Sequence, residues 1–205
     1  MIRPFAAQLR HLDSVYGDQP YFVGVKARLL AAFDLLALAF VPVNIATLFL
    51  LHVPDIPVRI VLNLAIFATA LLSLRWVWQG RLTFAGNAMA LGLILPTHAL
   101  VFLAGSFPQP LSAAIQLLAF DLVFLLVAIV FASRRVAMAV LVIIVAANLG
   151  IHALAFQQEF IPGTLKFAAD TLLRDALFAL GFVFCLGLAV LHMVETAHLR
   201  HKVCL

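Results

Sequence analysis

Apolar residues along this chain gather into six long stretches, and the short segments between them carry most of the charged residues. Each stretch holds about twenty residues or more, enough for a helix that crosses a hydrocarbon core about 30 Å thick. The pattern predicts an all-α, polytopic membrane protein with six transmembrane helices. We place these spans at residues 29–51, 56–78, 84–105, 111–132, 136–156 and 172–194.

The composition also indicates that lipid is the main solvent of the chain. Hydrophobic residues make up 65% of the sequence and charged residues 11%, with a mean hydropathy of +1.15. A chain of this kind has too little polar surface to cover a soluble globule. The charged amino-terminal segment lacks the apolar core of a signal peptide, so we expect it to stay attached.

Basic residues recur at a regular interval before the apolar stretches. Arg28, Arg81 and Arg134 lie about 53 residues apart, which is the length of two membrane crossings. The interval predicts three helical hairpins with their basic ends on one side of the membrane. An offset of 54 also superimposes His98 on His152 and Asp121 on Asp175. Internal duplication and chance alignment of apolar helices both stay open as explanations.

Lysine and arginine are distributed unevenly between the two predicted sides. Positive loops are retained in the cytoplasm, so the side with more of these residues is the cytoplasmic one. Ten lie on one side, which would also hold both termini: Arg3, Arg10, Lys26, Arg28, Arg75, Arg81, Arg134, Arg135, Arg200 and Lys202. Three lie on the other: Arg59, Lys166 and Arg174. We expect a multi-pass protein of the bacterial inner membrane, with the lipid bilayer and not nucleic acid as its partner.

Three regions follow from this topology. Residues 1–28 would form a cytoplasmic amphipathic juxtamembrane arm, residues 29–194 the six-helix bundle, and residues 195–205 the cytoplasmic start of a signalling or coiled-coil helix, because no Gly or Pro stops the last span. One face of the arm carries Phe5, Leu9, Leu12 and Tyr16. We expect this face to lie on the inner leaflet, or the arm to be an ordinary juxtamembrane helix.

Polar residues inside the spans each need a partner, a cavity or a use, because they cost free energy in lipid. We expect a structural role for Asp34, neutralised by Lys26 and Arg28 from one to two turns away. Asparagine side chains can form hydrogen bonds between helices. We expect that role for Asn63, Asn87 and Asn148.

A second set of polar residues lies in the outer half of the predicted bundle: His98, Gln116, Asp121, His152, Arg174 and Asp175. These side chains could line one pocket for a small polar or cationic ligand, or sense protons. The alternative is that Asp175 pairs with a basic neighbour, His152 extends to the interface and Asp121 bonds to a polar helix. Their spacing is not that of metal ligands, so we predict no metal or cofactor; His98 and His152 are the residues that a metal would use.

Catalytic motifs are scarce in this sequence. The nearest to a zinc-protease motif is His192 with Glu195 and His198, which has the wrong order and lies where the sixth helix would leave the membrane. We predict no catalytic residue. Any catalytic output would lie beyond Leu205.

Two short segments resemble a known group of proteins. Asp18, Gln19 and Pro20 precede Lys-Ala-Arg-Leu-Leu at residues 26–30. This arrangement is similar to the start of the six-helix membrane region of bacterial sensor histidine kinases, chemotaxis-type receptors and diguanylate cyclases. The resemblance implies a homodimer and a cytoplasmic signalling domain or partner protein, reached through Glu195, His198 and Lys202. No phospho-accepting histidine box, nucleotide-binding lobe or cyclase motif is present.

The sequence thus favours a membrane-embedded sensor or anchoring module of a bacterial signal-transduction protein. A stimulus on the periplasmic side or within the membrane would pass through the sixth helix to an output domain that is missing or separate. The alternatives are a small-solute or ion transporter or channel, and an integral-membrane enzyme that modifies lipid.

Overall fold

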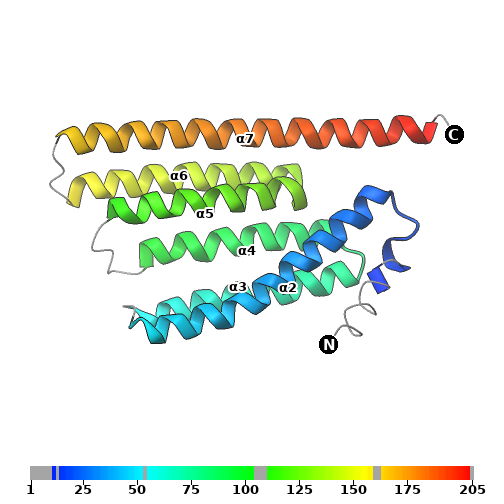
Figure 1. Ribbon diagram of the computed structural model, residues 1–205, viewed down its shortest axis with the longest axis horizontal. Coiled ribbons are helices and arrows are strands. Elements are labelled where there is room, and N and C mark those ends of the chain that lie inside the picture. The colour runs from blue at the N-terminus through cyan, green and yellow to red at the C-terminus, as the bar shows by residue number, and fades with distance from the viewer. Residues whose placement is uncertain (1–10, 13, 53–54, 104–109, 159–162, 204–205) are drawn as a thin grey trace. The chain divides into compact units, whose positions relative to one another are not determined.

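The computed structural model describes residues 11–12, 14–52, 55–103, 110–158 and 163–203. Within these ranges the chain is helical and contains no strand, which confirms the predicted all-α class. A helical stretch that includes residues 11–12 and 14–16 precedes the long helices (Figure 1). These are α2 (Tyr21–Leu50), α3 (Ile56–Trp78), α4 (Leu82–Leu103), α5 (Pro110–Phe131), α6 (Arg134–Gln158) and α7 (Gly163–Val203).

Four of the described helical segments are long and apolar enough to cross a membrane, as in a polytopic membrane protein. They are Tyr21–Leu50, Ile56–Trp78, Arg134–Ala153 and Leu172–Val194. Each coincides with a predicted span, and the first helix begins earlier than expected. The predicted arm, residues 1–28, therefore includes the first two turns of α2.

The helices group into two compact units, each of which holds three long helices. Unit 1 comprises Met1–Phe107 with Phe131–Val136, and unit 2 comprises Pro108–Val130 with Ala137–Leu205. The boundary falls between α4 and α5. The predicted second hairpin, made of spans 84–105 and 111–132, is thus divided between the two units.

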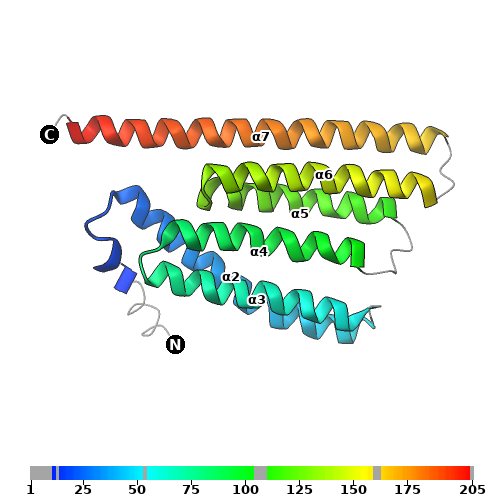
Figure 2. The ribbon, with the colours of Figure 1, turned by 180° about the vertical axis from the view of Figure 1, so that it is seen from behind.

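In unit 1, α3 packs along both α2 and α4, while α2 and α4 touch at few places (Figures 1 and 2). Gly92 of α4 lies at a close contact with α3. A Cβ atom added there would overlap the Thr69 side chain, with its Cβ and Oγ1 both 2.6 Å away. Small residues at such points allow two backbones to approach closely in lipid.

The turn between α3 and α4 is a Schellman motif, which satisfies the last carbonyl groups of α3. Gly80 adopts a φ of 77°, in the left-handed region that favours glycine. The Gly80 N–H donates to the Val77 carbonyl at 3.1 Å, and the Arg81 N–H donates to the Trp76 carbonyl at 2.9 Å. This turn holds Arg81 at the start of α4.

In unit 2, α5 contacts both α6 and α7. Asp121 of α5 bonds to Asn148 of α6. Gly187 of α7 lies against Ile129 of α5, where an added Cβ would come within 2.9 Å of the isoleucine Cγ2. Leu180 and Phe184 of α7 are also buried.

Helix α7 is longer than a membrane crossing requires. Its 41 residues give a length of about 60 Å, twice the hydrocarbon thickness. The apolar part ends at Val194, and the helix continues unbroken to Val203. The expectation that the last helix runs on past its span is confirmed.

Candidate functional site

A buried hydrogen bond joins α5 and α6 inside unit 2. The Asn148 Nδ2 group donates to the Asp121 Oδ2 atom at 2.6 Å and to the Ile144 carbonyl at 2.9 Å. Both side chains are completely buried. This hydrogen bond confirms the alternative prediction for Asp121, that it bonds to a polar residue on a helix.

His152 lies one turn beyond Asn148 on α6. Its Nδ1 atom is 3.0 Å from the Asn148 carbonyl oxygen, and the residue is only 2% exposed. A carbonyl oxygen accepts hydrogen bonds and cannot donate them, so the proton of the neutral ring is assigned to Nδ1. His152 is buried and does not extend to the interface. We call Asp121, Asn148 and His152 the unit 2 polar cluster.

The unit 2 polar cluster joins two helices through one buried contact. The Asp121 carboxyl group of α5 accepts from the Asn148 amide of α6, and the His152 ring bonds to the Asn148 carbonyl oxygen within α6. A change at Asp121 therefore alters a buried contact between α5 and α6, where the low dielectric makes such contacts strong.

Two other residues of the predicted outer pocket contact each other. Arg174 and Asp175 form an ion pair with each other at 3.1 Å, and their side chains are 65% and 62% exposed. This confirms the alternative that Asp175 pairs with a basic neighbour. His98 belongs to unit 1, where it is buried. Gln116 lies on α5, and its side chain is outside the described residues.

The two histidines that an offset of 54 superimposes form the same contact with their own helices. His98 places its Nδ1 atom 3.0 Å from the Ile94 carbonyl, four residues earlier, as His152 does with Asn148. The repeat fails at the two aspartates, because Asp121 is buried and Asp175 is exposed. The same offset superimposes Pro42 on Pro96, and both prolines lie inside helices, α2 and α4.

Asp34 forms the corresponding buried contact of unit 1. The Ser73 hydroxyl on α3 lies 2.8 Å from Asp34 Oδ2 on α2 and 3.3 Å from the Ala85 carbonyl on α4. All three helices of unit 1 meet at this serine. The expected neutralisation by Lys26 and Arg28 is wrong for the described structure, in which the partner of Asp34 is Ser73. The sequence contained a signal for it, a serine inside the next span.

The predicted contacts between helices are confirmed for Asn63 and Asn148, whereas Asn87 bonds to the turn between α5 and α6. Asn44 Nδ2 donates to Asn63 Oδ1 at 2.8 Å, linking α2 to α3. Asn87 Oδ1 accepts the Ser133 backbone N–H at 2.7 Å, and the Ser133 hydroxyl caps the start of α6 at Val136. The Asn44–Asn63 and Asn148–Asp121 bonds each join two consecutive helices, α2 with α3 and α5 with α6.

The predicted output residues lie on the extension of α7. Glu195, His198 and Lys202 belong to its helical backbone, and their side chains are outside the described residues. His192, one turn before Thr196, is exposed. Among the described residues, no group of three His, Cys, Asp or Glu side chains is arranged to hold a metal ion.

The amino-terminal arm docks on the α3–α4 turn of unit 1. The Tyr16 hydroxyl donates to the Val77 carbonyl at 2.8 Å, and Leu12 and Tyr16 are 3% and 6% exposed. These two residues of the predicted amphipathic face contact protein, so the expectation that they lie on the leaflet is wrong. Phe5 and Leu9 are outside the described residues. Burial raises the pKa of Tyr16, which keeps its hydroxyl a donor.

Tyr16→Phe is expected to loosen the arm, because it removes the hydrogen bond to Val77 and keeps the ring. Amide exchange across residues 14–19 should accelerate about fivefold, the effect of one lost hydrogen bond of about 1 kcal/mol. In the parent, this contribution should be present below the usual pKa of 10.0 and lost as pH rises past the raised value. Tyr21→Phe is the matched control, since Tyr21 is 79% exposed. Equal exchange in both variants would contradict the docking role of the hydroxyl.

Comparison with known proteins adds no relative. No protein-family model matches the chain, and neither the curated proteins nor the solved structures contain a significant match.

Proposed function

We propose that this chain is the six-span sensor or anchoring module of a bacterial signal-transduction protein in the inner membrane. Helices α4 and α5 each contain 22 residues, about 33 Å, which is long enough for two further crossings besides the four apolar segments. The uneven distribution of basic residues, ten against three, supports a cytoplasmic location for both ends of the bundle.

The sensing element in this proposal is the unit 2 polar cluster. Ionisable groups within a membrane bundle are costly and usually serve function. The cluster combines a carboxylate, an amide and an imidazole in buried positions on two helices. Binding of a proton or a small polar ligand there changes the contact between α5 and α6.

The observation that carries the proposal is the continuity of α7 from Gly163 to Val203, together with its close contact with α5. Asp121 and Ile129 lie about two turns apart on α5. The first bonds to α6, and the second contacts Gly187 of α7. A shift of α5 that follows a change at Asp121 thus reaches the helix that leaves the membrane. A stimulus drives this shift only by binding one arrangement more tightly than the other.

The output surface in this proposal is the α7 extension that carries Glu195, His198 and Lys202. A rigid helix transmits tilt, rotation or translation over its whole length, and a second copy of the chain would turn such a motion into a dimer rearrangement. The partner is a cytoplasmic signalling domain, either joined to this helix or on a separate protein.

The test joins the full chain through α7 to a histidine-kinase reporter in intact cells. Asp121→Asn keeps an acceptor oxygen and removes the charge, while His152→Ala removes the imidazole. Each variant is expected to change reporter output at least about fivefold, the lower end of typical coupling between sites. Membrane insertion, measured by fractionation and protease protection, should equal that of the parent.

Leu149→Ala is the matched control, because Leu149 adjoins Asn148 on α6 and is 48% exposed. Its output should match the parent. If Asp121→Asn and His152→Ala both insert normally and both give the parental output, the cluster is not the sensing element and the proposal fails.

The transporter alternative rests on buried ionisable residues and on Pro42 and Pro96, with Asp34 and Asn87 as the main polar groups of the predicted inner half. The Asp34 carboxylate bonds to the Ser73 hydroxyl of α3, and the same hydroxyl contacts the Ala85 carbonyl of α4. The contact of Asp34 thus helps to join the three helices of unit 1. We therefore give the sensor proposal precedence.

A further inference from the structure

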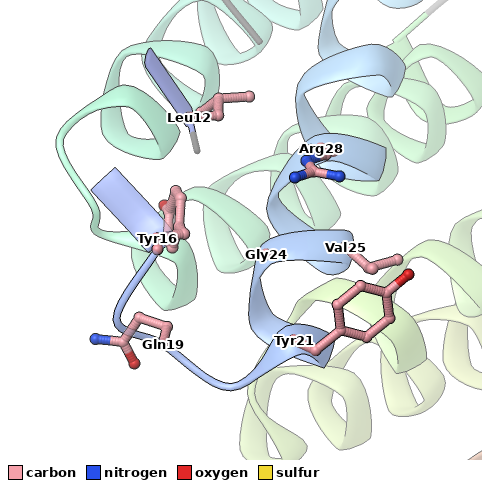
Figure 3. Close-up of a pocket in the computed structure, with 8 residues that line it drawn as sticks. Leu12, Tyr16, Gln19, Tyr21, Gly24, Val25 and Arg28 are labelled. Atoms are coloured by element: carbon pink, nitrogen blue, oxygen red, sulfur yellow. The ribbon is translucent and has the colours of Figure 1, made fainter. Parts of the chain in front are cut away.

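A cavity of about 310 Å³ opens between the amino-terminal arm and the first turns of α2 (Figure 3). Residues of the arm form one side, and residues of α2 form the other. The lining residues are Leu12, Tyr16, Gly17, Gln19, Tyr21, Gly24, Val25 and Arg28. This cavity takes no part in the sensor proposal, because it lies in unit 1 and the polar cluster lies in unit 2.

The α2 side of the cavity combines a guanidinium with an open stretch of backbone. Arg28 is exposed and lies one turn after Gly24. A Cβ atom added at Gly24 would meet nothing within 4 Å, so the glycine leaves free space beside the arginine. A guanidinium presents a planar fork of N–H groups that matches phosphate oxygens in pairs.

The arm side of the cavity is held in place by buried contacts. Tyr16 is anchored through its hydroxyl to Val77, and Leu12 is buried beside it. Val15 lies against the α3–α4 turn, 3.4 Å from the position of a Cβ atom at Gly80. The cavity wall is thus fixed to α3 and to the α3–α4 turn.

The surroundings favour a negatively charged group at the headgroup level of a membrane. The cavity lies at the amino-terminal end of α2, an apolar helix long enough to cross the bilayer. Lys26 precedes Arg28 on the same helix, and Arg75 and Arg81 flank the turn on which the arm docks. Asp18, also in the arm, is exposed and is the opposing charge. Exposed tyrosines such as Tyr21 are enriched at membrane interfaces.

We infer that this cavity binds the phosphate group of an anionic membrane lipid, with Arg28 as the contacting cation and Gly24 providing the space for the headgroup. A lipid held in the bilayer next to α2 is present at high effective concentration. Dissolved phosphate lacks that advantage, and a single exposed arginine binds it weakly in water. The same chemistry therefore favours the lipid as the source of the phosphate.

The test uses the full chain in nanodiscs made from equal amounts of phosphatidylglycerol and phosphatidylcholine. After release from the nanodisc, native mass spectrometry counts the lipids of each kind that stay bound. We expect the parent to retain phosphatidylglycerol in preference to phosphatidylcholine. Arg28→Gln should lower this preference about tenfold, the effect of one charge-assisted contact, and Arg28→Lys should keep part of it.

Gly24→Leu tests the same cavity without a change of charge. Its side chain would fill the free space, so we expect the lipid preference to fall as it does in Arg28→Gln. Gly181→Leu is the matched control, because a Cβ atom at Gly181 of α7 also meets nothing within 4 Å. It should retain the parental preference. Circular dichroism and gel filtration check that each variant is folded.

Three results would overturn the inference. The first is equal retention of the two lipids by the parent. The second is a preference that survives both Arg28→Gln and Gly24→Leu. The third is binding of inorganic phosphate to the lipid-free, detergent-purified protein with the affinity and Arg28 dependence of the lipid, which would make the cavity a site for dissolved phosphate. Each of these results is independent of the reporter output that tests the sensor proposal.

Discussion

Gly92→Ala is expected to destabilise the protein by about 2 to 3 kcal/mol, because the new Cβ atom would overlap Thr69 at the contact between α3 and α4. Threonine is branched at Cβ and stiff in a helix, so its side chain has little freedom to move away. The two helices must separate instead, which weakens the packing throughout unit 1. Unfolding in bicelles, followed by steric trapping, measures the change.

A compensating substitution distinguishes overlap from other effects of Gly92→Ala. In the Gly92→Ala/Thr69→Gly double variant, space is restored by removing the side chain that the new methyl group would meet, so we expect most of the lost stability to return. Gly150→Ala is the control, since a Cβ atom at Gly150 meets nothing within 4 Å. It should leave stability unchanged or raise it slightly, because alanine has the better helix propensity. A loss in Gly150→Ala equal to that in Gly92→Ala would contradict the packing argument.

Asn148→Ala is expected to cost about 2 kcal/mol, because the buried Asp121 carboxylate loses the amide donor at 2.6 Å. Hydrogen bonds between membrane helices are often worth less than this. Here the acceptor is a buried carboxylate, and hydrogen bonds to such groups are stronger than those between neutral groups. The same bicelle unfolding assay measures the loss.

The pair is best tested as a double-mutant cycle with Asp121→Ala. We expect the double variant to lose at least about 1 kcal/mol less than the sum of the two single losses, because each single variant breaks the same hydrogen bond. Asp121→Ala combined with Leu149→Ala is the control pair, which should be additive. Additivity of Asp121→Ala and Asn148→Ala would show that the contact contributes nothing to stability.

Several elements of the fold could be predicted because they depend on local composition. The predicted spans 56–78 and 172–194 coincide with Ile56–Trp78 and with the apolar part of α7. Hydrophobic length alone defines such segments. The continuation of α7 to Val203 was also predictable, because no Gly or Pro interrupts the sequence after Val194.

The partners of the polar residues were harder to predict. Asp34 was paired with Lys26 and Arg28 because they are close in sequence, whereas the structure pairs it with Ser73 on the next helix. The choice depends on the rotation of α2 about its axis, and an apolar helix has no strong pattern to reveal that rotation. For the same reason, the sequence predicts a polar helix partner for Asp121 only as one alternative and does not identify that partner as Asn148.

The contacts of the amino-terminal arm were also hard to predict from the sequence. Its amphipathic face was visible in Leu12 and Tyr16, but an apolar face fits a lipid surface and a protein surface equally well. The Schellman turn at Gly80 and the Val77 carbonyl together provide the site to which Tyr16 binds. That site exists only when α3 and α4 have folded.

The sequence by itself determined that the chain is helical and contains several segments able to cross a membrane, because both properties follow from the length and hydropathy of continuous segments. It also identified which residues are polar in an apolar setting. Only the tertiary structure decided which of these meet, since contacts such as Ser73 with Asp34 and Asn148 with Asp121 depend on how neighbouring helices are rotated and how closely they pack. In lipid that rotation is set by small residues and polar contacts between helices and not by a hydrophobic face.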